Sequence, residues 1–294
     1  MEFKDWIGDA WQAHGDDARG VAQRVIPEGL PLARSGDDVA ALGRLAQHVY
    51  GEHLTQWTEG RAVLRQLAAH AHGAGARPTL RVLDASLALA GGIADERASL
   101  SASERIRVGS LAAGSLIEHA PRRAGALLRD AVADAEATTL ADDDPACRAL
   151  AIVGNNIACA LEGKRDRSGD ERALMILAAQ TAREYWARAG TWLETERAEY
   201  RLAQTWRHAG DLAQARRHAQ SCLEIVRANG SPPLEAFFGW EVLGLVERDA
   251  GNATGHAHAL AQARASFSAL DEGDRGWCKP SLDALAATPG AAAS

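Results

Sequence analysis

The chain has few of the features that mark secreted, membrane-spanning or nucleic-acid-binding proteins. Its four cysteines show no CxxC spacing, which favours small buried thiols in a reducing compartment over a disulfide framework. The formal net charge of −7 lacks the basic excess needed to neutralise phosphates, so we expect no nucleic-acid partner. The first residues, MEFKDWIGDAWQ, are acidic where a signal peptide is basic, and no run of about 18 apolar residues occurs. We therefore expect a cytoplasmic protein that does not associate with membranes.

Aromatic residues are also scarce, at 5% of the 294 residues, while Ala, Leu and Arg dominate. Ala, Leu and Arg lose little conformational freedom in a helix, whereas aromatic and β-branched residues lose more. Hydrophobic residues reach 47%, which is enough for a packed core. The composition predicts an all-α protein.

One segment shows a clear helix-turn-helix unit: residues 198–226 read AEYRLAQTWRHAGDLAQARRHAQSCLEIV. Its Leu202-Ala203 pair, Trp206, the Gly210-Asp211 turn and Ala215 resemble a tetratricopeptide repeat. The residues fit that reading chemically, because Gly tolerates the left-handed end of a helix and Asp caps the next one. Small residues such as Ala203 and Ala215 let the two helices approach closely.

The same pattern recurs along the chain. Gly8 and Gly15 are seven residues apart, as are Ala203 and Gly210, and Gly251 follows Gly210 by 41 residues. The string LAQAR, at 212–216 and again at 260–264, predicts that the last second helix is about two turns longer. Ser101-x-x-Glu104 predicts a capping box, and Pro145 after an acidic run predicts a helix start. Weaker copies of the small-residue pair lie at Leu45-Ala46, Leu111-Ala112 and Val153-Gly154.

The resemblance implies a single domain over residues 1–294, folded as a right-handed α-α superhelix (solenoid) of antiparallel helix pairs. The expected units are 1–35, 36–75, an irregular 77–140 that includes an extra helix, 144–190, 191–229, 231–272 and a C-terminal cap at 273–294.

No motif in the sequence carries recognisable catalytic chemistry. The pairs His70-x-His72 and His256-x-His258 would point about 200° apart on a helix. His48 and His53 have neither HExxH order nor a third ligand at a recognised spacing. A GxSxG elbow, a phosphate loop and a GxGxxG turn are also missing. We expect no catalytic residues, no cofactor and no metal.

In tetratricopeptide arrays the first helices of successive pairs line a concave groove, and their non-packing positions contact a peptide. Asn155 resembles the amide that family members use against a peptide backbone, since it can both donate and accept. The full lysine and asparagine clamp for a terminal carboxylate is missing, so such a ligand is not implied. By position, the resemblance places these residues in the groove: Arg148, Asn155, Arg197, Arg201, Gln204, Arg207, Glu241 and Arg248.

The sequence therefore predicts a non-enzymatic scaffold or adaptor whose partner is a protein or peptide, and a homo-oligomer is compatible with the pattern. Two alternatives stay open. One is a regulatory module that senses a small ligand or a signal peptide, and the other is an enzyme whose site is assembled across several repeats.

Overall fold

The computed structural model describes residues 1–70 and 75–287, and every regular element in those ranges is helical, which confirms the all-α prediction. The first helices are α1 (Phe3–Ala13), α2 (Ala18–Arg24), α3 (Leu30–Leu32), α4 (Gly36–His48), α5 (Trp57–His70), α6 (Ala76–Ala90) and α7 (Ala102–Gly114). The later ones are α8 (Pro121–Glu136), α9 (Pro145–Glu162), α10 (Gly169–Ala189), α11 (Trp192–Ala209), α12 (Leu212–Ala228), α13 (Pro233–Asp249), α14 (Ala253–Ser268) and α15 (Glu272–Ala286). Two π turns, Val25–Gly29 and Val49–His53, and a 3-10 turn, Arg97–Ser99, interrupt the α-helical series.

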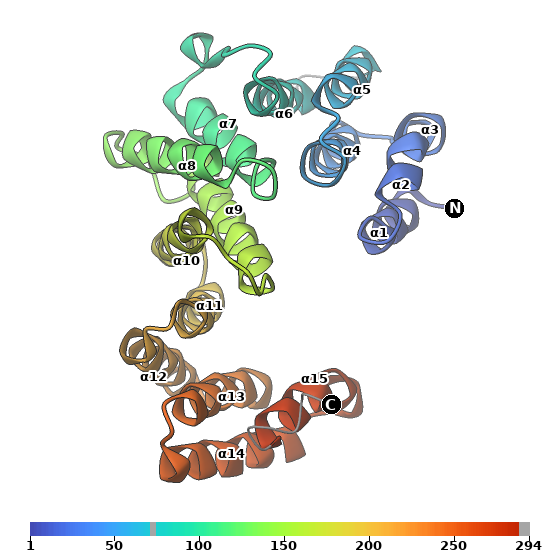
Figure 1. Cartoon of the computed structure of the whole chain (residues 1–294). Helices are drawn as coiled ribbons and strands as arrows, with labels where there is room; N and C mark the ends of the chain where they lie inside the picture. The colour runs from blue at the N-terminus through green and yellow to red at the C-terminus, as the bar shows by residue number, and fades with distance from the viewer. Residues whose placement is uncertain (71–74, 288–294) are drawn as a thin grey trace.

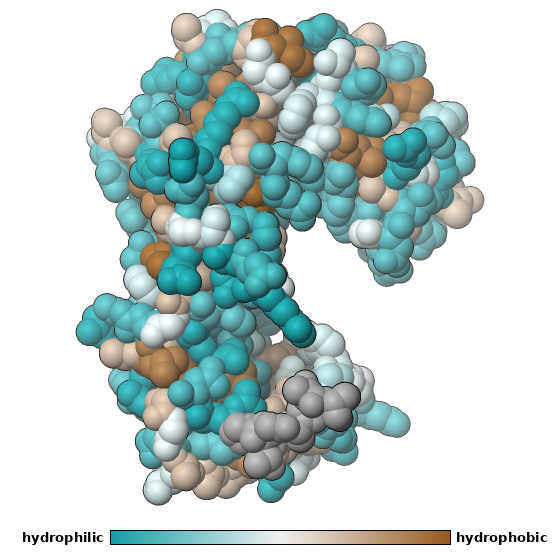
Figure 2. All heavy atoms as spheres, in the orientation of Figure 1, coloured by the Kyte–Doolittle hydropathy of each residue, from teal (hydrophilic) through white to brown (hydrophobic). Residues whose placement is uncertain are grey.

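Helices that follow one another in the chain pack as pairs, most extensively α7 with α8, α9 with α10, α11 with α12, and α13 with α14. The pairs stack into an open, C-shaped array with α1 to α3 at one end and α15 at the other (Figure 1), and the space-filling view shows the same open hollow (Figure 2). The inner side of the curve carries α9, α11 and α13, and their partners α10, α12 and α14 lie on the outer side (Figure 1). This is the arrangement of an all-α repeat fold.

Most of the residues predicted to form turns and helix caps have the expected conformation. Gly210 and Gly251 adopt positive φ values of 86° and 70°, and Asp211 and Asn252 cap the following helices. The capping box at Ser101 and the proline start after Asp144 are also present. At the first turn, however, the cap is Asp17, whose carboxylate accepts from the Gly20 amide at 2.9 Å.

The predicted lengthening of the last second helix is wrong. Helix α14 has 16 residues and α12 has 17, and α14 starts 41 residues after α12, as Gly251 follows Gly210. The second LAQAR string lies in the middle of α14 instead of at its start. The repeat of the five-letter string is therefore a coincidence, and the 41-residue spacing of the two turns predicts the correct register.

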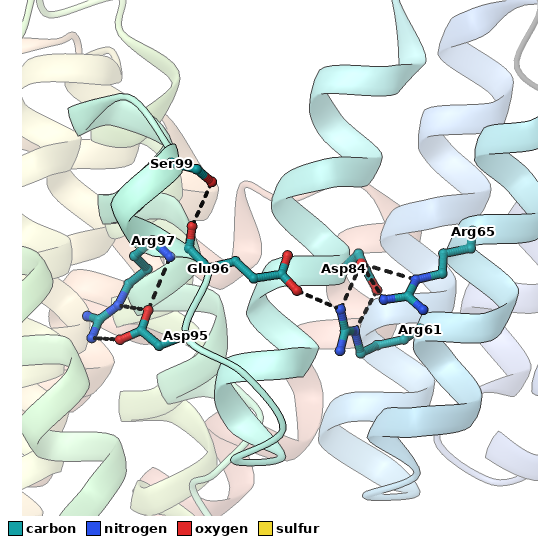
Figure 3. A network of polar contacts seen from close by, with 7 residues as sticks. All are labelled: Arg61, Arg65, Asp84, Asp95, Glu96, Arg97 and Ser99. Carbon is teal, nitrogen blue, oxygen red and sulfur yellow. Dashed lines mark hydrogen bonds and ion pairs between the residues drawn. The ribbon is translucent and has the colours of Figure 1, made fainter.

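Helix α6, expected as an extra helix, packs against α4, α5 and α7. A buried arginine holds it in place: Arg61 of α5 donates to both oxygens of Asp84 on α6, at 2.7 and 3.1 Å, and to Glu96 at 3.0 Å (Figure 3). Bidentate pairing of this kind fixes orientation as well as distance. The network joins α5, α6 and the segment leading to α7.

Small residues bring the later helices close together. A Cβ atom on Gly154 of α9 would lie 2.5 Å from the Ala178 carbonyl oxygen of α10. Ala203 of α11 is fully buried and clusters with Ala219 of α12 and Val242 of α13. The cap expected at 273–294 contains α15, and its last residues, 288–294, lie outside the described chain. None of the helices in the described ranges is long and apolar enough to cross a membrane.

Candidate functional site

Two adjacent pockets open on the inner face of α9, α11 and α13. The first, here called the aromatic pocket, has a volume of about 430 Å³ and contains Asn155, Arg197, Leu234, Phe238 and Trp277. The second, here called the basic pocket, has a volume of about 690 Å³ and contains Lys164, Arg165, Arg167, Gln204 and Arg207. Tyr200 and Arg201 line both. Five of the eight predicted groove residues, Asn155, Arg197, Arg201, Gln204 and Arg207, line at least one of these pockets.

A row of aromatic rings forms one wall of the aromatic pocket. The Tyr200 ring of α11 lies 5.9 Å from the Phe238 ring of α13, and Phe238 lies 5.1 Å from the Trp277 ring of α15. Trp277 is 64% exposed, which is unusual for so large an apolar side chain. The rings therefore offer apolar surface that a ligand can cover without displacing the core.

Asn155 faces this pocket from α9 with its amide largely available. Within the described chain, Asn155 makes one side-chain hydrogen bond, in which its Nδ2 donates to the side-chain oxygen of Asn156 at 3.4 Å. The group can therefore still donate and accept, which is the pairing that a peptide bond offers.

Arg201 is held rigidly between the two pockets. Its Nη1 donates to Glu162, the last residue of α9, and the Thr205 hydroxyl donates to the other oxygen of the same carboxylate. The Arg201 Nε is buried and finds no acceptor among the described residues. One N–H of a positioned guanidinium thus remains without a partner at the boundary of the two pockets.

A second polar chain runs from Glu241 to Asp249. The Tyr200 hydroxyl donates to Glu241 at 3.3 Å, and Gln204 Nε2 donates to Tyr200 at 3.0 Å. Arg207 donates to Gln204 at 2.9 Å and to Asp249 at 2.6 Å. Burial raises the pKa of Glu241 to about 7. Glu241, which was predicted as a groove residue, is 5% exposed and lines neither pocket. It contacts the groove through the Tyr200 hydroxyl, which donates to its carboxylate.

Positive charge dominates the basic pocket. Burial and, to a lesser extent, the neighbouring cations Arg207 and Arg167 together lower the pKa of His208 to about 4. Arg165 is exposed and makes no ion pair with any described residue. Lys164 pairs with Glu171, which lies outside the pocket lining. The pocket is therefore suited to a carboxylate or another anion.

The remaining predicted residues lie elsewhere or are exposed at the margin. Arg148 stacks over the Trp186 ring at 5.3 Å, and Arg248 donates to the Ala284 carbonyl at 2.7 Å. Neither Arg148 nor Arg248 lines the aromatic or the basic pocket. Arg197 pairs with Glu235 at 3.2 Å and its side chain is 60% exposed.

The sequence alone does not reveal the aromatic wall, because nothing in it shows where α15, which carries Trp277, returns against α13. Three cysteines are buried as expected, whereas Cys159 is exposed and lies on the wall of the basic pocket.

Comparisons with protein-family models, with curated proteins and with solved structures find no match to this chain.

Proposed function

We propose that the chain is a tetratricopeptide-like, right-handed solenoid that binds a peptide segment of a partner protein on its inner face. The adjacency of an apolar and a cationic pocket on that face is the observation that carries the proposal. Because both pockets share Tyr200 and Arg201, a ligand that fills them needs an apolar anchor and an anionic group only a few residues apart. Asn155 would bind the ligand backbone beside the apolar anchor, in the aromatic pocket.

The energetics favour the aromatic pocket as the main source of affinity. Apolar anchors in desolvated pockets usually dominate peptide binding, while charges at a rim mainly set specificity and association rate. The preferred ligand is thus an extended or helical segment with a large apolar side chain near Asp or Glu. Among the described residues, the three carboxylates that line the pockets already have partners: Glu162 accepts from Arg201, Glu196 accepts from the Cys222 thiol, and Glu235 pairs with Arg197. This favours binding over catalysis.

Short fluorescent peptides with a Trp or Leu anchor and neighbouring acidic residues test the proposal by anisotropy. A matched set carries Lys in place of each acid. We expect the acidic set to bind, Trp277→Ala to weaken binding by about 30-fold, as for the loss of a hot spot, and Arg165→Glu to slow association.

Trp192→Ala is the matched control, because Trp192 is 37% exposed but lines neither pocket. Equal affinities for both peptide sets, or equal losses from Trp192→Ala and Trp277→Ala, would contradict the proposal.

A further inference from the structure

Three histidines from separate segments meet at the N-terminal end of the array. His14 follows α1, His48 ends α4, and His53 ends the π turn Val49–His53. One ring nitrogen of each lies within 4.8 Å of the others, and the Nε2 atoms of His48 and His53 are 3.1 Å apart. The sequence spacing of His48 and His53 did not reveal this cluster, because the third histidine, His14, comes from a distant segment that follows α1.

The π turn explains why His48 and His53 share one face. In a continuous α-helix, residues five apart would point about 140° away from each other. Here the Leu54 amide donates to the Val49 carbonyl, five residues back, at 3.0 Å. This wider turn brings the fifth residue back beneath the first. Single π turns of this kind are frequent at functional sites.

The other ring nitrogens of two of these histidines are already occupied. His48 Nδ1 lies 3.0 Å from the Glu52 carboxylate, and His14 Nδ1 contacts the Trp11 carbonyl oxygen. An acceptor at Nδ1 fixes the N–H there and leaves Nε2 as a lone-pair donor. Histidines that bind metals almost always have such an outer partner, a carboxylate or a backbone carbonyl.

Two carboxylates, Glu52 and Glu118, line the same pocket as the three histidines and favour a cation there. The three rings are 4.9 to 5.1 Å apart and lie edge to face. They border a pocket of about 430 Å³ whose far wall includes Glu118 and Asn156.

We propose that His14, His48 and His53 bind one divalent transition-metal ion, Zn²⁺ or a similar borderline ion, and leave one coordination position open to this pocket. A tetrahedral ion with Zn–N distances of about 2.0–2.1 Å needs donor atoms roughly 3.3 Å apart, close to the present separation of His48 and His53. His14 lies just beyond the end of α1, and its donor atom is within 4.8 Å of those of the other two histidines. The proposal does not depend on the peptide groove.

The bound ion would join α1 to α4, two helices that otherwise share few contacts. Since an ion that binds only the folded state stabilises it by mass action, the metal would raise the melting temperature of the protein. The open position would accept water or a donor side chain of a partner.

The test uses full-length, tag-free protein, because a polyhistidine tag binds the same ions. After chelation, the protein is titrated with Zn²⁺ by calorimetry and with Co²⁺ by visible absorption, which reports nitrogen ligands and coordination geometry. We expect one ion per chain, a higher melting temperature with metal, and loss of tight binding in each of His14→Ala, His48→Ala and His53→Ala. Glu52→Gln should weaken binding by about 10- to 100-fold, as other outer-partner substitutions do.

His258→Ala on α14 is the control, since His258 is exposed and distant in the chain. Far-ultraviolet circular dichroism establishes that each variant is folded, and if one variant does not fold, the other two still decide. Absence of stoichiometric binding to the wild type, or unchanged binding in folded His53→Ala and His48→Ala, would overturn the proposal.

Discussion

Arg201 of α11 and Glu162 of α9 form an ion pair between the first helices of two successive helix pairs. The pair is largely withdrawn from water, with side-chain exposures of 21% and 7%. Thr205 supports the same carboxylate. One arginine thus has two roles, since it fixes the spacing of α9 and α11 and shapes the boundary between the aromatic and basic pockets.

Arg201→Met should destabilise the protein by about 3 kcal/mol, because it leaves a buried carboxylate without its cation. Arg122→Met is the control, because its ion pair with Asp170 has side-chain exposures of 86% and 46%, and such exposed pairs contribute about 0–1 kcal/mol. Urea unfolding of both variants measures the difference. Similar small losses in the two would show that the Arg201 pair contributes no more than a surface pair.

Gly154→Ala should destabilise by about 1–3 kcal/mol or more, since the new Cβ would meet backbone atoms of Ala178 and Ala182 at 2.5 and 2.9 Å. Gly8→Ala, at the matching position of the first unit, should instead stabilise by about 0.5–1 kcal/mol, because nothing lies within 4 Å of its Cβ. Thermal and urea unfolding measure both. The opposite order would mean that the close approach of α9 and α10 is misplaced.

These two glycines show what the sequence could and could not predict. The repeated small residue, the turn at Gly210 and the cap at Asp211 all follow from local chemistry, so helix positions and pairing could be read in advance. Whether a small residue is truly crowded depends on the neighbouring helix, and the pattern alone made Gly8 and Gly154 look equivalent.

The candidate sites depend still more on contacts between residues that are far apart in the sequence. The resemblance to tetratricopeptide repeats placed five of the pocket-lining residues in the groove by position, but their ion pairs could not be predicted. Arg201 and Arg207, which were predicted only as groove residues, both pair with acids of other helices. Trp277 and His14 join their sites only through the packing of α15 and α1.

Ala203→Leu should cost about 1–3 kcal/mol, because Ala203 is fully buried between Ala219 and Val242 and the added carbons have no space. Ala213→Leu is the control on an exposed position of α12, where the change should be within about 0.5 kcal/mol. The two variants are compared by urea unfolding at one pH. An unchanged stability in Ala203→Leu would contradict the observed register of α11 against α12 and α13.

Glu196 is a groove-side carboxyl on α11 that is only 2% exposed. Burial raises its pKa to about 7, although the Cys222 thiol donates to its carboxylate at 2.9 Å. Because the folded-state pKa lies above the unfolded value of about 4.3, the unfolded state binds fewer protons between these values. The group therefore lowers stability as pH rises from about 4.5 to about 7, and its unfavourable contribution stays constant above that range.

Glu196→Gln removes the ionisation but keeps a carbonyl oxygen for the thiol. Relative to the wild type it should be nearly neutral at pH 4.5 and stabilising at pH 8, by up to an amount on the order of 3 kcal/mol. Urea unfolding of both proteins across this pH range gives the difference directly and cancels the titration of other groups. Glu184→Gln, on an exposed position of α10, should show no such dependence. A difference between Glu196→Gln and the wild type that does not grow with pH would mean that Glu196 ionises as freely as a solvated carboxyl.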